Sequence, residues 1–254
     1  MRNKDQADVL IVCGQGVYLD GCYYSEYPDR DVYMGHAIAV RKLFNSFNYS
    51  HIVCSGGYSQ RNRLNKTINS TSEAESFINM WEDTKSWPLT RGRPILDTFS
   101  LDSAENVILG LICARRELKN KHIRRIGVFS SWQFKKKRFN SLAKNLGIIE
   151  RFYFHGYQNT YMADAGELAL FGEKEFLKVN GDDPFLLSKV AENKKRKRYA
   201  GHDFQNRLAV IEDAFPSIFQ ALSDLKKHKN EQQKSEFLSI FHKLIIAGSP
   251  TKIY

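Results

Sequence analysis

The chain is poor in cysteine and lacks the spacings at which cysteine and histidine usually bind metal ions. Its 254 residues hold four cysteines and seven histidines. The cysteines are Cys13, Cys22, Cys54 and Cys113. They form no C-x-x-C pair, and two of them lie in apolar runs, which favours buried free thiols over a disulfide or a zinc site. The histidines show no H-x-x-x-H spacing. We therefore predict no bound metal.

Long apolar runs and several familiar nucleotide and hydrolase motifs are also missing. No stretch approaches the ~20 apolar residues of a membrane-spanning helix. The polar start of the chain does not have the pattern of a signal peptide. The sequence contains no P-loop, no G-x-G-x-x-G and no G-x-S-x-G elbow. We expect a soluble, cytoplasmic protein.

Positive charge, by contrast, is in excess. Lysine and arginine number 38 against 28 acidic residues, for a formal net charge of +10. Such a field favours contact with anions, whether nucleotides, nucleic acid or an acidic membrane, without naming one. A hydrophobic content of 42% and the chain length allow a substantial buried core.

Strand-like and helix-like segments alternate along the first part of the chain. Short apolar runs predict strands, and between them apolar residues recur at helical spacing. The expected strands are 8–14, 51–54, 93–97, 126–130 and 148–154. This alternation predicts a Rossmann-like, doubly wound α/β fold with a mostly parallel sheet. Such sheets bind ligands at the carboxyl ends of their strands.

The character of the sequence changes after about Gly166. Apolar residues then recur only at helical spacing, which predicts one helix over 204–225 and another over 237–245. Pro216 predicts a break within the first of them. We therefore divide the chain into a Rossmann-like domain, residues 1–165, and a helical extension packed on it, residues 166–254.

Polar clusters follow the predicted strands, where this architecture places its ligand. They are Ser55-Gly56-Gly57, Ser72-Glu73, residues 97–106 and residues 130–136. Glycine lets a ligand approach the backbone, and the start of a helix offers amide groups and a positive dipole end to an anion. The alternative for Ser-Gly-Gly is a simple strand-ending turn.

The order of these clusters resembles the YdcF/SanA/ElyC family, bacterial Rossmann-like domains largely of unknown function. The resemblance covers roughly residues 8–157 and lies in Gly14, Ser55-Gly56-Gly57, Ser72-Glu73-Ala74, Ser100-Leu-Asp-Ser-Ala-Glu-Asn106 and Ser130-Ser-Trp-Gln-Phe-Lys-Lys136. The chain departs from the family pattern by carrying Asp102 and Ser103 in place of Asn-Thr. It also has Gln133 where the family has histidine, and Lys136 where it has arginine. Glutamine cannot shuttle a proton as histidine does, and His36 is one substitute.

The resemblance implies a pocket for a small polar ligand, with S-adenosylmethionine as a candidate, and places the chain with the soluble members. The predicted ligand-binding residues are Gly14, Ser55, Gly56, Gly57, Glu73, Ser103, Asn106, Ser130, Gln133 and Lys136. If a reaction occurs, gathered and partly desolvated carboxylates are the best general bases, namely Asp97, Asp102 and Glu105. Whether the protein is an enzyme stays open.

Other interpretations of the same residues stay open beside this one. Asp102 and Ser103 are also typical helix caps, and Glu73 and Glu105 suit the first turn of a helix electrostatically. The basic runs 135–138 and 194–198 suit nucleic acid or an acidic surface, and equally a solvated helix face. A third basic stretch, 61–66, suits a lid over an anionic ligand. A non-catalytic sensor whose helical tail contacts a partner is the remaining hypothesis.

Overall fold

The computed structural model describes most of the chain. The described residues are 5–14, 16–19, 22–24, 30–58, 71–85, 87, 92–130, 132–157, 163–180, 183–193, 209 and 212–247. The basic stretches 61–66 and 194–198, and the first part of the predicted helix over 204–225, lie outside these residues.

A five-stranded parallel sheet forms the centre of the molecule. Its strands are β1 (Gln6–Cys13), β4 (His51–Ser55), β5 (Ile95–Asp97), β6 (His122–Ser130) and β7 (Phe152–Gly156). Their order is β5-β4-β1-β6-β7, so the chain winds outward in both directions from β1. The predicted doubly wound, Rossmann-like α/β fold is confirmed. Its topological switch point lies between β1 and β6, where such folds place ligands.

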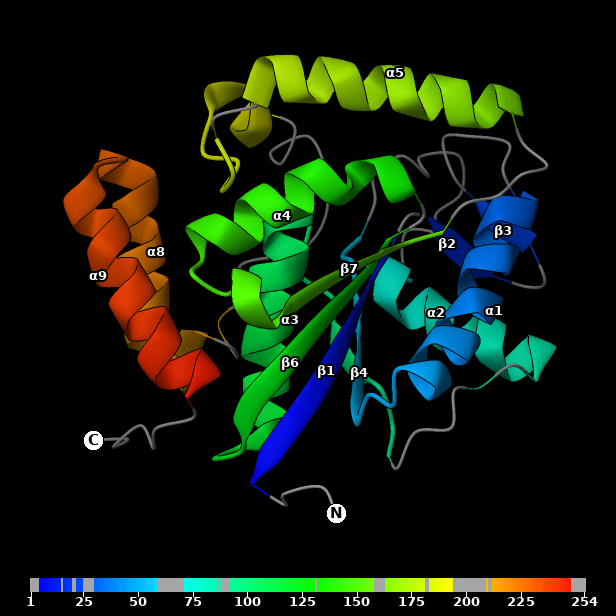
Figure 1. Ribbon diagram of the computed structural model, residues 1–254, viewed down its shortest axis with the longest axis horizontal. Coiled ribbons are helices and arrows are strands. Elements are labelled where there is room, and N and C mark those ends of the chain that lie inside the picture. Colours follow the sequence, from blue (N-terminus) through cyan, green and yellow to red (C-terminus); the bar gives the residue numbers. More distant parts are fainter. Residues whose placement is uncertain are drawn as a thin grey trace.

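Helices cover both faces of this sheet (Figure 1). On one face lie α1 (Arg30–Ser46) and α2 (Glu73–Thr84), and on the other α3 (Ser103–Leu118) and α4 (Lys136–Asn145). Residues of β1 alternate between the two cores: Leu10 and Val12 face α1 and α2, whereas Val9 and Ile11 face α3. The continuous apolar run of β1 is thus explained by burial on both faces.

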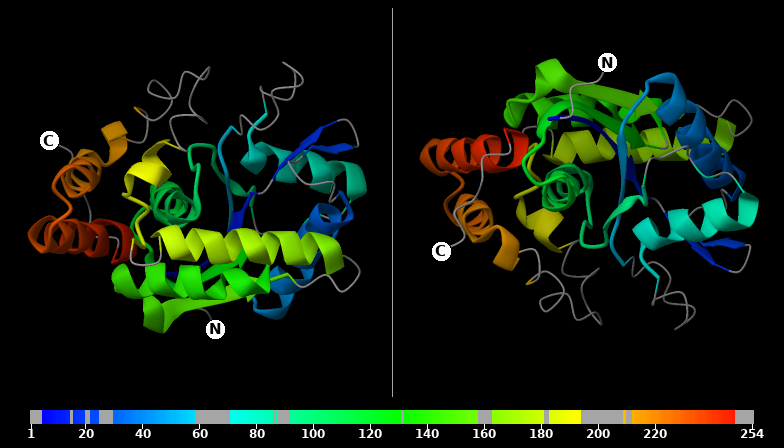
Figure 2. Two further views of the ribbon diagram at one scale, coloured as in Figure 1. Left: turned by 90° about the horizontal axis from the view of Figure 1, so that it is seen from above. Right: turned by 90° about the horizontal axis from the view of Figure 1, so that it is seen from below.

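A long helix, α5 (Ala163–Asn180), crosses the carboxyl ends of the strands, at the top of Figure 1. Figure 2 shows from above that it lies over α4 and reaches toward α1. This helix runs through the predicted domain boundary at 165/166. The division into two domains stays a prediction.

The described C-terminal residues are helical, as predicted. They form α8 (Pro216–His228), α9 (Glu231–Phe241) and a π-helical turn, η5 (His242–Ile246). Pro216 is the first residue of α8, where its missing N–H costs no helical hydrogen bond, so the predicted break is confirmed. Phe237 and Phe241 are buried in the same core as α3 and β6. Among the described helices, none is both long and apolar enough to cross a bilayer.

Some boundaries differ from the sequence-based expectation. The strand expected over 93–97 is shorter, Ile95–Asp97, and the strand expected over 148–154 begins only at Phe152. A 3-10 turn, η4 (Ile149–Arg151), precedes it. Other described elements are β2 (Val17–Leu19) and β3 (Cys22–Tyr24), which pair antiparallel, η3 (Gln133–Lys135) before α4, and short helical segments at 189–193 and 212–214.

Candidate functional site

The carboxyl ends of β1, β4 and β5 meet the first turn of α3 in a buried hydrogen-bond network. Ser55 Oγ donates to Asp97 Oδ2 at 2.6 Å and lies 3.1 Å from Asn106 Oδ1. The Asn106 side chain also bonds the Cys13 thiol, whose pKa burial raises to about 12. The structure thus brings three of the predicted site residues, Ser55, Asp97 and Asn106, together. The network ties three strand ends to a helix start.

Asp97 lies fully inside this network. Its carboxylate accepts from the hydroxyls of Ser55 and Ser100 and from the amides of Phe99 and Ser100. None of its surface is exposed, and burial raises its pKa to about 6 despite these hydrogen bonds. A general base must touch the proton that it removes. In this arrangement Asp97 anchors the strand end internally, and its predicted role as a general base stays a prediction.

Asp102 and Glu105 serve the start of α3. Asp102 Oδ1 accepts from the amides of Ala104 at 2.9 Å and Glu105 at 2.8 Å, which makes Asp102 the N-cap. Glu105 Oε2 accepts from the Leu101 amide at 2.9 Å, and the residue is buried. The alternative interpretation of these residues, helix capping, therefore describes the Oδ1 atom of Asp102 and the Oε2 atom of Glu105, and their role as general bases stays a prediction.

The three predicted glycines do not form a cradle of open amides. Gly14 N–H donates to Ser55 O at 2.6 Å, Gly56 N–H to Asp97 O at 2.9 Å, and Gly57 N–H to Ser100 O at 2.6 Å. Each of these amides is already used by the backbone of a neighbouring segment, so a ligand beside the glycines would have to be held by other groups.

The glycines are needed instead to admit the Glu73 side chain. A Cβ on Gly14 would lie 2.5 Å from Glu73 Cβ and 2.7 Å from Glu73 Oε2. A Cβ on Gly56, whose φ is +155°, would lie 2.8 Å from Glu73 Cβ. Glu73, the first residue of α2, thus brings a carboxylate against the ends of β1 and β4.

Two basic residues, Lys135 and Arg138, lie near the carboxyl end of β1. Lys135 in η3 and Arg138 in α4 both act electrostatically on the Cys13 thiol and lower its pKa against the effect of burial. Arg138 is also tied down: it forms an ion pair with Glu173 of α5, donates to Ser103 Oγ at 2.8 Å, and lies 3.8 Å from the Phe176 ring centre. Burial lowers the pKa of Arg138 to about 10.

His36 stands out among the buried polar groups near the switch point. Its side chain is 0% exposed, and neither ring nitrogen has a hydrogen-bond partner among the described residues. The ring packs against Phe129 at 4.5 Å and Phe77 at 5.7 Å between ring centres. Burial and the charge of Lys135 lower its pKa to about 3, so the imidazole is neutral. Buried nitrogens without partners are rare, and each calls for an explanation such as a bound water or ion, a catalytic role or stored strain.

The remaining predicted residues follow β6. Ser130 is buried at the end of the strand, beside Gly156 of β7. Gln133 Oε1 accepts from the Gly156 amide at 3.0 Å and so holds η3 against β7. Lys136, the first residue of α4, is exposed. The Gln133 side chain therefore has a local structural role as a hydrogen-bond acceptor, which glutamine can fill although it cannot transfer protons as histidine does.

Sequence reasoning missed the contribution of α5. Glu173 and Phe176 hold the Arg138 guanidinium, yet they lie in a helix that shows no motif beyond helical spacing. Only the packing of α5 over the strand ends reveals them. Within the described ranges no group of His, Cys, Asp or Glu side chains is arranged to hold a metal ion.

Comparison with protein-family models, with curated proteins and with solved structures finds no match for this chain. The YdcF-like resemblance therefore remains a prediction that rests on the order of the motifs.

Proposed function

We propose that this protein binds a small polar molecule, nucleotide-like or otherwise anionic, at the carboxyl ends of β1, β4 and β6. His36 is the observation that carries the proposal. An unpaired buried polar group costs roughly 1–3 kcal/mol, so a fully buried imidazole that has no partner among the described residues is unfavourable. Because the ring has no exposed surface, a ligand can reach it only if the covering Phe77 and Phe129 rings or α1 shift. A ligand that then bonds the imidazole would recover that free energy.

The charges around the switch point narrow the ligand class. Lys135 offers a cation for a phosphate or carboxylate, and Glu73 offers a carboxylate for a hydroxyl, amine or other positive group. A molecule with groups of both kinds suits this arrangement. S-adenosylmethionine, the candidate suggested by the resemblance, carries a carboxylate together with an amine and a sulfonium.

Catalysis at this site has less support than ligand binding. The carboxylates of Asp97, Asp102 and Glu105 accept hydrogen bonds from the fold itself, so we assign no general base at this site. The nucleic-acid alternative draws less support from the described basic run, because Arg138 is largely buried and paired with Glu173. Only part of that run is available to a phosphate backbone.

A thermal-shift screen tests the binding proposal. The panel contains S-adenosylmethionine, S-adenosylhomocysteine, nucleotides, sugar nucleotides and short nucleic acids. A ligand at one hundred times its Kd stabilises the folded state by about 2.7 kcal/mol. We expect one small molecule to raise the unfolding midpoint of the native protein, and Glu73→Gln and Lys135→Gln to reduce that rise. Lys144→Gln, an exposed lysine in α4, is the matched control.

His36→Leu separates a ligand role from a packing role. Removing both unpartnered nitrogens should stabilise the empty protein, by about 1 kcal/mol, while abolishing most of the ligand-induced shift. Urea unfolding and the same thermal screen measure the two effects. A native protein that responds to no small molecule, or only to nucleic acid in a salt-dependent manner, would refute the proposal.

A further inference from the structure

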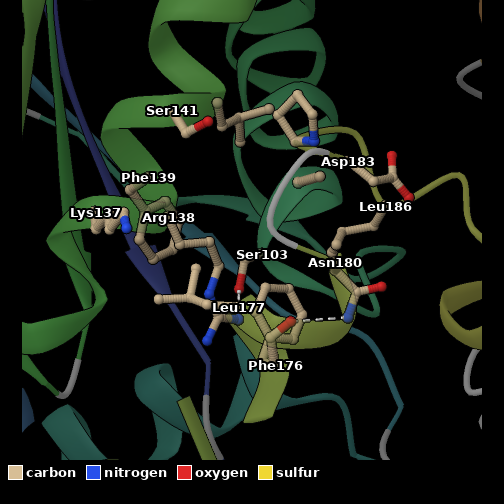
Figure 3. A pocket seen from close by; sticks show the side chains of 13 residues that line it. Ser103, Lys137, Arg138, Phe139, Ser141, Phe176, Leu177, Asn180, Asp183 and Leu186 are labelled. Atoms are coloured by element: carbon tan, nitrogen blue, oxygen red, sulfur yellow. Dashed lines mark hydrogen bonds between the residues drawn. The ribbon is translucent and has the colours of Figure 1, made fainter. Parts of the chain in front are cut away.

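A cavity of about 340 Å³ lies between α3, α4, α5 and the segment 183–186. Its volume is at the small end of the roughly 300–1,000 Å³ typical of ligand pockets. Ser103, Lys137, Ser141, Phe176 and Leu186 are among the residues that line it. Figure 3 shows α4 side chains on one side of the view and Asn180, Asp183 and Leu186 on the other.

Most of the charged and amide groups of this cavity are already used by the protein. Arg138 pairs with Glu173, so its charge is balanced. Asn180 donates to Phe176 O and accepts from Ser188 Oγ. Asp183 accepts from the Ser188 amide at 2.6 Å. These groups shape the cavity without demanding a ligand.

Two polar groups of α4 remain open. In the described part of the chain, neither the Lys137 ammonium nor the Ser141 hydroxyl has a hydrogen-bond or ion-pair partner. Ser103 accepts from Arg138 and keeps its own proton to donate. The other walls are apolar: Ala104, Phe139, Leu142, Phe176, Leu177, Pro184 and Leu186.

We infer that this cavity is a second binding site, for a small monoanion with an apolar body, such as an aliphatic or aromatic carboxylate. The carboxylate accepts from Lys137 and the serine hydroxyls, and the hydrocarbon part packs on the leucine and phenylalanine walls. A charge-assisted hydrogen bond and apolar burial then act together. The inference does not depend on a ligand at the switch point.

Isothermal titration of the full chain with octanoate tests this site, with octanamide as the uncharged counterpart. We expect octanoate to bind more tightly than octanamide. Lys137→Gln should weaken octanoate binding about tenfold and leave octanamide unchanged, since only one charge-assisted bond is lost. Lys144→Gln, from the same helix but outside the cavity, should change neither.

Filling the cavity provides the second arm. Ser141→Phe should abolish binding of both compounds. Circular dichroism checks that this variant folds. If it does not fold, the smaller substitution Ser141→Leu takes its place and should weaken binding of both compounds. Absence of octanoate binding to the native protein, or binding that Lys137→Gln and the Ser141 variants leave unchanged, would overturn the inference. Glu73→Gln and Lys135→Gln, the variants at the strand ends, should bind octanoate as the native protein does, whether or not a ligand binds at the strand ends. The experiments can therefore refute one proposal without refuting the other.

Discussion

Asp97 shows how a single residue can resemble a catalytic group and yet serve the fold. A carboxyl near other acidic residues at a strand end is a reasonable general base from sequence alone. In the structure it accepts four hydrogen bonds from its own surroundings and has no exposed surface. Its raised pKa, about 6, comes from burial rather than from a neighbouring carboxylate.

The raised pKa of Asp97 makes a prediction about stability and pH. The folded protein holds the Asp97 proton more tightly than the unfolded chain, so the associated stabilisation is present below about pH 4 and is lost as pH rises through about 6. At roughly 1.4 kcal/mol for each tenfold change in proton affinity, the loss is about 3 kcal/mol. The difference in free energy of unfolding between the native protein and Asp97→Asn should therefore fall from pH 4 to pH 7.

Urea unfolding at several pH values measures this difference. Asp83→Asn, at an exposed carboxyl in α2, is the control. A difference between native protein and Asp97→Asn that does not vary over this range would contradict the assignment of a buried, proton-retaining carboxyl.

At the scale of elements, α3 connects the strand ends to the C-terminal helices. Its N-terminus is capped by Asp102 and joined to β4 through Asn106. Near its other end, the buried Arg115 guanidinium donates to the carbonyls of Lys119, Lys121, Ile245 and Ile246. One helix thus carries both the candidate site and the attachment of the tail.

Arg115→Lys should destabilise the protein by about 2–4 kcal/mol. An ammonium cannot reach carbonyls on both sides as the planar guanidinium does, so buried acceptors lose their donors. Chemical unfolding measures the loss. Arg116→Lys, at the exposed neighbouring position, should change the free energy of unfolding by less than about 0.5 kcal/mol. Equal effects of the two substitutions would exclude this role for Arg115.

At the scale of the whole molecule, the tail and the sheet share one core. Phe237, Phe241 and Ile245 are fully buried in the cluster that also contains Val107, Ile112 and Ile126. A shared core couples the unfolding of its parts, because neither face is stable when exposed to water.

Phe241→Ala should therefore lower the stability of α3 and β6 as well as that of α9, by about 3–5 kcal/mol. Hydrogen exchange should show reduced protection in all three elements. Phe171→Ala in α5 removes a side chain that is 65% exposed and should have little effect. Lost protection confined to α9 would show instead that the tail unfolds independently.

Several features follow from the sequence by local physics. Doubly buried strands produce continuous apolar runs, as in β1, and Pro216 begins a helix because its ring restricts the preceding turn. The cluster of Ser55, Asp97 and Asn106 also follows, since the carboxyl ends of parallel strands share one edge of the sheet.

The use of each polar group, however, was decided only by the tertiary structure. Sequence cannot show that the amides of Gly14 and Gly56 bond other strands, or that Glu73 occupies the space beside them. Nor can sequence show that Glu173 pairs with Arg138, or that the buried His36 ring has no hydrogen-bond partner among the described residues. Apolar periodicity and the alternation of strands with helices are properties of neighbouring residues along the chain. Hydrogen-bond partners depend on atoms that folding brings together from distant segments.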